Sequence, residues 1–313
     1  MPELHVIFGT GPLGKWTGRE LIKQGKRVRL INRSGKTNRL PEGAEIVAGD
    51  AYDVNKNIEL TKGAAAIYQC AQPQYLEWAE KFPRFQSAIM EAAVANKSKF
   101  IVADNLYMYG DTHGAPILED SPYQAHTKKG KVRGEMANAV MEAHRAGKIR
   151  AAIGRASDFF GPDDRAFLTD TAIRSAVLEK TINLLGRLDQ PHTFSYAPDF
   201  GKLLATLGTH EDALGQIWFT PSPAPITQNE FIKIMEAELG RPVKVLAAGT
   251  ALMSFLGLFS PIMHETVEMM YEWTQPFIMD SSKAEKAFGW KGTSLQQAIR
   301  ETISWLKEDI KKQ

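Results

Sequence analysis

A glycine-rich loop near the start of the chain constrains the fold more than any other feature. Gly9-Thr10-Gly11-Pro12-Leu13-Gly14 follows an apolar stretch, residues 4–8, and opens a segment with helical signals, residues 12–24. In such a loop the first glycine allows a tight turn, the second admits a phosphate to the backbone, and the third packs helix on strand. The loop therefore predicts a dinucleotide-binding strand–turn–helix unit. The residues expected to hold the dinucleotide here are Gly9, Gly11, Pro12, Leu13 and Gly14.

The first half of the chain repeats this alternation of strand and helix. Short apolar stretches typical of buried strands lie at residues 28–32, 44–49, 64–70, 100–103 and 151–155. Helical segments lie between most of them, at residues 55–61, 78–96 and 132–146. Such alternation indicates an α/β fold of the Rossmann type, a doubly wound parallel sheet with helices on both faces.

The pattern changes after Arg155, where helical segments dominate and proline and glycine interrupt them. We therefore expect a dinucleotide-binding domain over residues 1–165. Residues 166–313 are expected to form a smaller, mostly helical region that binds substrate, with residues 194–220 returning to the Rossmann core.

Composition excludes several classes of function. The net charge is +2 without a long basic run, so nucleic acid is not an expected partner. A single cysteine, Cys70, rules out a disulfide framework, and no metal site is expected. The amino terminus has neither the basic nor the long apolar stretch of a signal peptide, which favours a cytoplasmic protein.

One apolar stretch, residues 245–263, is about long enough to cross a bilayer. It contains Gly249, Gly257 and Pro261, and it follows a charged amphipathic segment. We therefore expect no membrane span, and interpret the stretch as a buried helix or a lid over an apolar pocket.

The end of the second strand distinguishes NAD from NADP. A carboxylate there would bind the ribose hydroxyls of NAD, but the chain has Asn32, Arg33, Ser34 and Lys36 around Gly35. Arg33 and Lys36 can neutralise a 2′-phosphate, and Ser34 can donate a hydrogen bond to it. NADP(H) is therefore expected in preference to NAD(H). The alternative is that both cations are ordinary loop residues in solvent.

Other cofactor contacts are expected where strands end, because the carboxyl ends of parallel strands face the ligand crevice. Asp50 is placed to accept a hydrogen bond from the adenine amino group. The remaining residues expected to contact the cofactor from strand ends are Ala51, Ala71 and Ser157.

Several motifs in order resemble the extended short-chain dehydrogenase/reductase family, described broadly as NAD-dependent epimerase/dehydratase. Besides the glycine loop they are Gly49-Asp50, Asn105-Leu106-Tyr107-Met108-Tyr109-Gly110, Glu119-Asp120-Ser121-Pro122, Arg155-Ala156-Ser157-Asp158-Phe159-Phe160-Gly161-Pro162, and Met279-Asp280-Ser281-Ser282-Lys283. The resemblance covers nearly the whole chain and implies a Rossmann fold and a nicotinamide cofactor.

The chain departs from this family at the catalytic positions. The family uses a Tyr and, four residues later, a Lys on a helix, with a Ser on the preceding strand. Here the matching residues are Lys129, Arg133 and Asn105. The resemblance implies that Arg133 can bind ribose and that Asn105 can donate to the substrate oxygen, while the usual phenol is missing.

Tyr107 is the strongest alternative proton donor. It lies two residues after Asn105, and side chains alternate along a strand, so we expect both on the face toward the nicotinamide. The alternative is an aromatic residue packed in the cleft wall.

The substrate side favours a small apolar ligand. Sugar-nucleotide members of the family often carry an Arg where this chain has His192, and the carboxyl-terminal half is rich in residues such as Phe255, Phe259, Met269 and Trp273. The leading hypothesis is an NADP(H)-dependent oxidoreductase that reduces a small apolar carbonyl or enone. A non-catalytic NADP(H)-binding regulator and a sugar-nucleotide epimerase or dehydratase are the alternatives. A homodimer through residues 78–96 and 132–146 is expected by analogy with the family.

Overall fold

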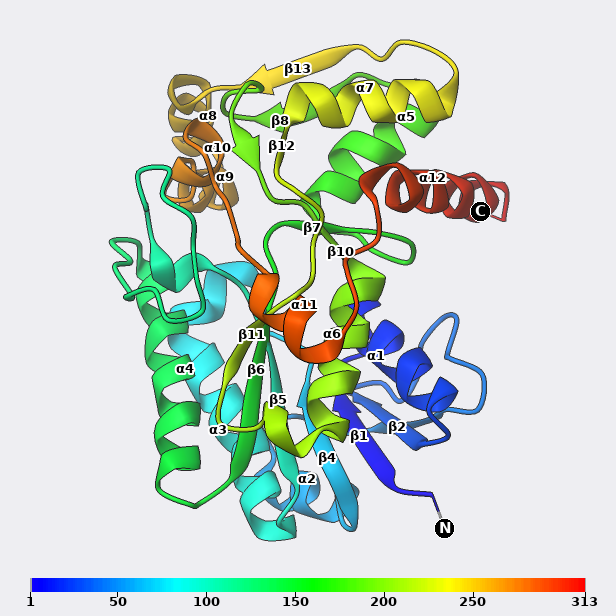
Figure 1. Cartoon of the computed structure of the whole chain (residues 1–313), viewed down its shortest axis with the longest axis vertical. Coiled ribbons are helices and arrows are strands. Elements are labelled where there is room, and N and C mark those ends of the chain that lie inside the picture. Colours follow the sequence, from blue (N-terminus) through cyan, green and yellow to red (C-terminus); the bar gives the residue numbers. More distant parts are fainter. Residues whose placement is uncertain (1, 313) are drawn as a thin grey trace. The chain divides into compact units, whose positions relative to one another are not determined.

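The computed structural model describes residues 2–312, which form two compact units (Figure 1). The first unit contains the chain up to Met108 together with Lys128–Arg155 and Phe200–Trp218. The second contains Tyr109–Thr127, Ala156–Asp199 and the chain from Phe219 onward. Each unit therefore consists of segments that are far apart in the sequence, and each is described separately.

A seven-stranded sheet in the order β11-β6-β5-β4-β1-β2-β3 is the centre of the first unit. The registered pairs from β6 to β3 are all parallel. Most strand residues are buried, which agrees with the apolar runs in the sequence. The sheet confirms the predicted Rossmann-type fold. Its strands are β1 (Leu4–Phe8), β2 (Arg27–Asn32), β3 (Glu45–Ala48), β4 (Ala64–Gln69), β5 (Lys99–Asp104), β6 (Arg150–Arg155) and β11 (Ile217–Phe219).

Helices pack on this sheet in two groups. One group contains α2, α3 and α4, which contact one another in that order. The other group contains α1 and α6, which pack closely on each other. A Cβ on Gly201 of α6 would lie only 2.5 Å from the Cβ of Trp16 on α1. The two groups wind the sheet doubly, as the alternation predicts. The helices are α1 (Pro12–Lys23), α2 (Val54–Leu60), α3 (Trp78–Asn96), α4 (Lys128–Arg145) and α6 (Ala197–Thr209).

The second unit is mostly helical around its own apolar core. Phe160, Phe194, Phe231 and Trp273 are buried together there. A capping box between Thr227 and Glu230 starts one of its longer helices, α7. Its helices are η3 (Leu168–Arg174), α5 (Ser175–Val177), α7 (Gln228–Leu239), α8 (Thr250–Gly257), α9 (Pro261–Val267), α10 (Tyr271–Thr274), α11 (Ser282–Phe288) and α12 (Leu295–Lys311). Two-stranded sheets pair β10 (Ser195–Tyr196) with β7 (Phe159–Phe160), β12 (Ile226–Thr227) with β9 (Pro191–His192), and β13 (Val245–Ala248) with β8 (Ile182–Leu185).

The apolar stretch 245–263 does not form the buried helix that we expected. It is divided into β13, α8 and the start of α9, because Gly249 precedes α8 and Pro261 begins a new helix. Met253 faces the core, but Phe255 and Phe259 are exposed. No helix among residues 2–312 is long and apolar enough to cross a membrane.

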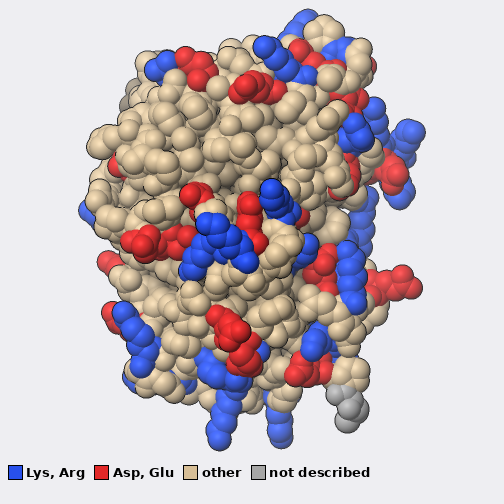
Figure 2. Space-filling view, in the orientation of Figure 1, with Lys and Arg blue, Asp and Glu red and all other residues tan. Residues whose placement is uncertain are grey.

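Charges of both signs are mixed on the face drawn in Figure 2, where Lys and Arg side chains are interspersed with Asp and Glu. Ion pairs of the described chain include Lys26 with Glu3 (2.6 Å) and Arg29 with Glu45 (2.9 Å). This mixture agrees with the small net charge of the chain.

A buried histidine makes the first unit sensitive to acid. His5 on β1 is fully buried, and its Nδ1 lies 2.8 Å from the hydroxyl of Tyr68 on β4. Burial, with a smaller contribution from Lys26, lowers the pKa of His5 to about 4. The folded protein keeps His5 neutral while the unfolded chain takes up a proton as the pH falls below about 6.5.

We therefore expect the free energy of unfolding to fall by roughly 3 kcal/mol from this residue as the pH drops from about 6.5 to 4. His5→Gln retains hydrogen-bonding capacity but does not titrate, so its stability should depend less on pH over this range. Urea unfolding at several pH values measures the difference. His113→Gln, at an exposed histidine, is the control, and an equally steep loss in His5→Gln would contradict the assignment.

Candidate dinucleotide and catalytic site

The glycine loop between β1 and α1 has the geometry that a pyrophosphate requires. Gly9 has a φ of +118°, and a Cβ there would lie 2.9 Å from the backbone of Cys70 and Ala71. A Cβ on Gly14 would lie 2.1 Å from the carbonyl oxygen of Gly9, so only glycine allows the helix to approach the strand this closely. At Gly11 a Cβ would meet nothing within 4 Å, which leaves open space beside the backbone.

The amino-terminal end of α1 is suited to an anion. Gly11 is its N-cap and supplies no side chain to the first amides, and Pro12 occupies the first turn beside Leu13. No acidic residue lies in that turn. Its unsatisfied amides and the positive end of the helix dipole can therefore face a phosphate. The residues of the loop fit a dinucleotide.

Asn32 shapes the loop after β2. Its amide nitrogen donates to the hydroxyl of Thr10 and to the carbonyl of Lys36, both at 2.8 Å. Its Oδ1 accepts from the Gly35 amide at 2.7 Å and from the Ser34 hydroxyl at 3.3 Å. Because these bonds use both acceptor positions of Oδ1, Asn32 is not a substitute for the ribose-binding carboxylate of NAD enzymes.

Three side chains of this loop face solvent. Arg33, Ser34 and Lys36 are all exposed, and they lie within four residues of the end of β2. Gly35 between them has a φ of +63°, and a Cβ on it would lie 3.1 Å from Ala48. The loop therefore presents two cations and a hydroxyl next to the strand end where the second ribose of a dinucleotide lies in Rossmann folds.

The ends of β3 and β4 bring the other expected cofactor residues to the same edge of the sheet. Asp50 is exposed, and its carboxylate accepts a hydrogen bond from the amide of Tyr52 at 3.1 Å. Ala51 is buried and its carbonyl accepts from Asn57 at 2.8 Å. The backbone of Ala71 lies directly against Gly9, since a Cβ on Gly9 would come within 2.9 Å of the Ala71 nitrogen. Burial raises the pKa of the neighbouring Cys70 thiol to about 12, so this thiol is not a nucleophile.

Lys129 and Arg133 lie one turn apart on α4. The helix begins at Lys128, four residues earlier than expected, so Lys129 is in its first turn. Both side chains are buried, with exposed fractions of 3% and 4%. The Lys129 ammonium lies 4.1 Å from the centre of the Tyr75 ring, a cation–π contact.

Arg133 belongs to a buried ionic bracket that sequence reasoning missed. Its Nη2 donates to the carboxylate of Asp104, the last residue of β5, and to the carbonyl of Ala103 at 3.3 Å. The other carboxylate oxygen of Asp104 accepts from Arg155, the last residue of β6, at 2.9 Å. Asp104, Arg133 and Arg155 together are called the Asp104 bracket below.

The bracket leaves part of Arg133 for other partners. Its Nε and Nη1 are buried and have no hydrogen-bond partner among the described residues. The guanidinium lies over the rings of Phe82 (4.7 Å) and Trp78 (5.4 Å). Buried donors of this kind normally find a partner, so a bound ligand is a natural acceptor for them.

Asn105 and Tyr107 are both half-buried, but the argument that paired them is wrong. β5 ends at Asp104, and Tyr107 lies in a short 3₁₀ helix (η2, Tyr107–Tyr109), so strand alternation does not apply to it. They are linked instead through the backbone, since the Tyr107 amide donates to Asn105 Oδ1 at 3.2 Å. The Tyr107 ring lies 6.1 Å from that of Trp78. The backbone amide of Asn105 in turn donates a hydrogen bond to the carboxylate of Asp104 at 2.9 Å.

Ser157 lies in the second unit, where its buried hydroxyl has no hydrogen-bond partner among residues 2–312. The carboxylate of the next residue, Asp158, lies within hydrogen-bond distance of His192 Nε2, at 3.0 Å. His192 Nδ1 lies 3.1 Å from the carbonyl of Glu272, which can only accept, so Nδ1 carries a proton. Burial, with Asp158 nearby, raises the pKa of Glu272 well above its usual range.

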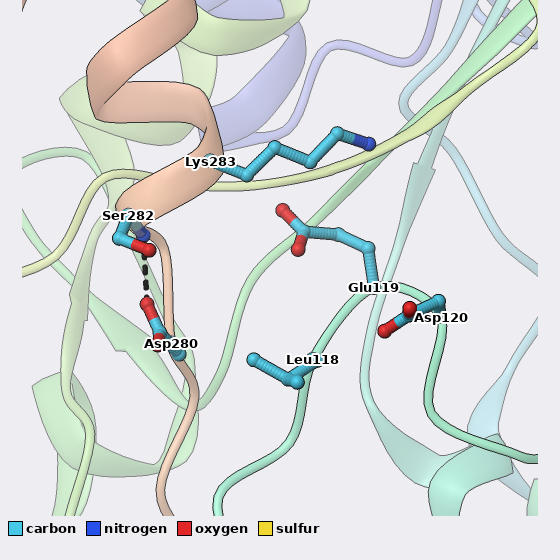
Figure 3. A pocket seen from close by; sticks show the side chains of 6 residues that line it. All are labelled: Leu118, Glu119, Asp120, Asp280, Ser282 and Lys283. Atoms are coloured by element: carbon cyan, nitrogen blue, oxygen red, sulfur yellow. Dashed lines mark hydrogen bonds between the residues drawn. The ribbon is translucent and has the colours of Figure 1, made fainter.

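Figure 3 shows a separate cavity of about 250 Å³ in the second unit. Glu119 and Lys283 point into it from different segments, and Ser282 donates its amide to Asp280 at 2.9 Å. Burial raises the pKa of Glu119 and lowers that of Lys283. The Glu119 carboxylate also accepts from the Phe219 amide at 3.1 Å, so this region joins two of the unit's chain segments, Tyr109–Thr127 and the chain from Phe219 onward.

The sequence model of the NAD dependent epimerase/dehydratase family matches residues 6–218. Among curated proteins, the uncharacterized protein y4nL of Sinorhizobium fredii is 22% identical over 93% of this chain and 86% of its own length.

Solved structures share the fold at low sequence identity. A UDP-glucose 4-epimerase from Thermotoga maritima, solved with UDP-glucose, superposes with a TM-score of 0.80 at 14% identity, over 98% of this chain and 99% of its own. A dTDP-glucose 4,6-dehydratase from Streptomyces venezuelae with NAD and TYD bound has a TM-score of 0.78 at 16% identity, over 98% and 97%. A UDP-glucose 4-epimerase from Thermus thermophilus in complex with NAD has a TM-score of 0.79 at 14% identity. The match covers 97% of this chain and 99% of that one.

The Asp104 bracket yields a prediction about stability. Asp104→Asn keeps the shape of the side chain but removes the negative charge that the buried Arg133 and Arg155 share. We expect a loss of about 3–5 kcal/mol in the free energy of unfolding, measured by chemical denaturation. Asp189→Asn, which breaks an exposed pair with Arg187, is the control and should change stability much less. Equal losses in both variants would contradict a structural role for the bracket.

Proposed function

Because the chain belongs to the NAD dependent epimerase/dehydratase family, we propose that it is an NADP(H)-dependent oxidoreductase that reduces a small apolar carbonyl or enone. The observation that carries the cofactor choice is the loop after β2. There the side chain of Asn32 is used inside the loop, and Arg33 and Lys36 are exposed beside it. Two cations without a carboxylate favour a 2′-phosphate over a free ribose hydroxyl.

The dinucleotide, when bound, supplies a hydride to the substrate carbon. The chain holds it at the α1 amino terminus, where Gly9, Gly11 and Gly14 allow the pyrophosphate to approach the backbone. The buried donors of Arg133 are suited to a ribose hydroxyl, which accepts hydrogen bonds. The Asp104 bracket fixes the direction of this guanidinium.

The substrate oxygen becomes negative as the hydride arrives, and this chain offers three groups for it. The side-chain Oδ1 of Asn105 already accepts a hydrogen bond from the backbone amide of Tyr107. The side-chain Nδ2 of Asn105 therefore remains to donate to the substrate oxygen. Lys129 adds a buried positive charge one turn before Arg133. Tyr107 is the phenol closest to Asn105 in the chain and is proposed as the proton donor.

A non-catalytic NADP(H)-binding regulator is the second candidate. It is favoured by the fact that Lys129 and Arg133, at the two catalytic positions of the family, are both engaged with neighbouring side chains. A sugar-nucleotide epimerase or dehydratase is the third, since solved neighbours include such enzymes. His192 is already bonded to Asp158 and Glu272, and so is a weak substitute for the Arg that such members often carry there.

Cofactor choice is tested by titrating the protein with NADPH and with NADH, following tryptophan fluorescence or the heat of binding. We expect NADPH to bind at least about tenfold more tightly, or roughly 1.4 kcal/mol. Arg33→Ala should remove most of that preference while leaving NADH binding unchanged. Lys62→Ala, at an exposed lysine after α2, is the control. Equal affinities for both nucleotides in the unaltered protein would overturn the NADP(H) assignment.

Catalysis is tested by a screen of small apolar ketones, aldehydes and enones, with NADPH oxidation as the readout. For any compound turned over, Tyr107→Phe should lower kcat by about 10²-fold or more and leave the NADPH affinity within about twofold. Tyr123→Phe is the matched control. An unchanged kcat in Tyr107→Phe would exclude this phenol as donor. If no compound reacts and NADPH instead alters binding to a partner protein, the regulator hypothesis holds; binding of a UDP- or dTDP-sugar would favour the third candidate.

A further inference from the structure

An apolar surface lies on the second unit, along β13, α8 and α9. Phe259 and Leu258 are exposed to 77% and 75% of their full area, although both are large and apolar. The α8–α9 surface is defined here by Val245, Leu246, Leu252, Phe255, Leu258, Phe259 and Ile262, all of them exposed. Elsewhere in residues 2–312 the exposed large apolar side chains are scattered, at Leu76, Val94, Leu118 and Leu178.

The two short helices hold this surface in a fixed form. They pack against each other, and a Cβ on Gly257 would lie 3.1 Å from the backbone of His264, so glycine allows the close approach. Met253 points inward and is buried in the core of the unit. The rings of Phe255 and Phe259 lie 5.6 Å apart, edge to face, on the outer side. The exposed side chains are therefore arranged before any partner binds.

The exposed apolar area lies at the upper end of what a monomer usually leaves open, and goes beyond it when Val245 and Leu246 on β13 are counted with the residues of α8 and α9. If each of these side chains has about 150–200 Å² when fully exposed, the exposed fractions leave on the order of 600–800 Å². The largest apolar patch of a typical monomer is about 300–600 Å². A stable protein–protein contact buries about 800 Å² on each partner. The α8–α9 surface is thus close to one half of a dimer interface.

Charge decides between a protein and a membrane as the partner. Residues 245–263 contain no charged side chain, and two carboxylates follow them, Glu265 on α9 and Glu268 directly after it. An interfacial membrane helix is typically rich in Lys and Arg on its polar side, so acidic neighbours disfavour a lipid surface. An apolar face without charged side chains can pack against the same face of a second copy, because no like charges then oppose each other across the twofold axis.

We propose that the α8–α9 surface is the contact between two copies of this chain, related by a twofold axis. In such an arrangement each copy presents the same residues to the other, which closes the assembly at two. This contact differs from the dimer expected by analogy with the family, which would use α3 and α4. It does not depend on the proposed function.

Sedimentation velocity over a concentration series tests the proposal. We expect the unaltered protein to sediment as a dimer, and the double variant Phe255→Ser, Phe259→Ser to dissociate at least about tenfold more readily. Leu178→Ser, at an exposed leucine of the same unit, is the matched control. Val94→Ser probes the rival contact on α3. Circular dichroism and a cooperative thermal transition report whether each variant is folded.

A crosslink provides a second measurement that needs no loss of apolar area. Leu258→Cys places a thiol on the α8–α9 surface, while burial raises the pKa of the Cys70 thiol, the natural one, to about 12. We expect mild oxidation to give a disulfide-linked dimer of Leu258→Cys, and Leu178→Cys to stay monomeric on a non-reducing gel. Three results would each overturn the proposal: a monomer at every concentration, a dimer lost only in Val94→Ser, or a monomer that binds phosphatidylcholine vesicles through Phe255 and Phe259.

Discussion

The carboxylate of Asp104 is the interaction on which the candidate catalytic region depends. It ends β5, and it accepts hydrogen bonds from Arg133 on α4, from Arg155 at the end of β6 and from the amide of Asn105. One buried anion thus holds two buried cations, whose isolation would be costly. Asp104 fixes α4 against the end of β5 through Arg133. It thereby also fixes Lys129, which lies one turn before Arg133 on α4, and Asn105, which directly follows Asp104 in the chain. Arg133 and Asn105 bond to this side chain directly, and Tyr107 is linked to it through Asn105.

Sequence reasoning located the elements of the first unit because each has a strong local signal. The strands are apolar runs between turn residues, and the Gly9–Gly14 loop has a fixed place between a strand and a helix, so β1, β4 and α3 began at the residues predicted. The Asp104 bracket has no such signal, since its members are separated by 29 and 51 residues and meet only in the sheet. Tyr107 was misplaced for a different reason: the strand was expected over residues 100–103, but its alternation was applied beyond its end, where the chain forms η2.

The division into units illustrates the same limit. Tyr109–Thr127 leaves the first unit between β5 and α4, an excursion that we did not expect, whereas a return to the core was expected over residues 194–220, where Phe200–Trp218 lies. Composition changes along the chain show where helices replace strands, but they do not show which unit a short excursion joins. The segment 245–263 shows a further gap, since apolar content alone does not distinguish a core helix from an exposed pair such as α8 and α9. That difference depends on what surrounds the segment in space.

The exchange of a Tyr and a Lys for Lys129 and Arg133 bears on the chemistry proposed. A phenol can release a proton to an alkoxide, whereas a guanidinium stays charged and cannot. The chain nevertheless keeps positive charge at both positions, buried where charge acts strongly. At these two positions, stabilising a negative oxygen is therefore easier than protonating it. An enone reduced at carbon gives an enolate, which is less basic than an alkoxide and needs a proton less urgently. Under the proposed function, the two substitutions thus favour an activated alkene over a simple ketone as substrate.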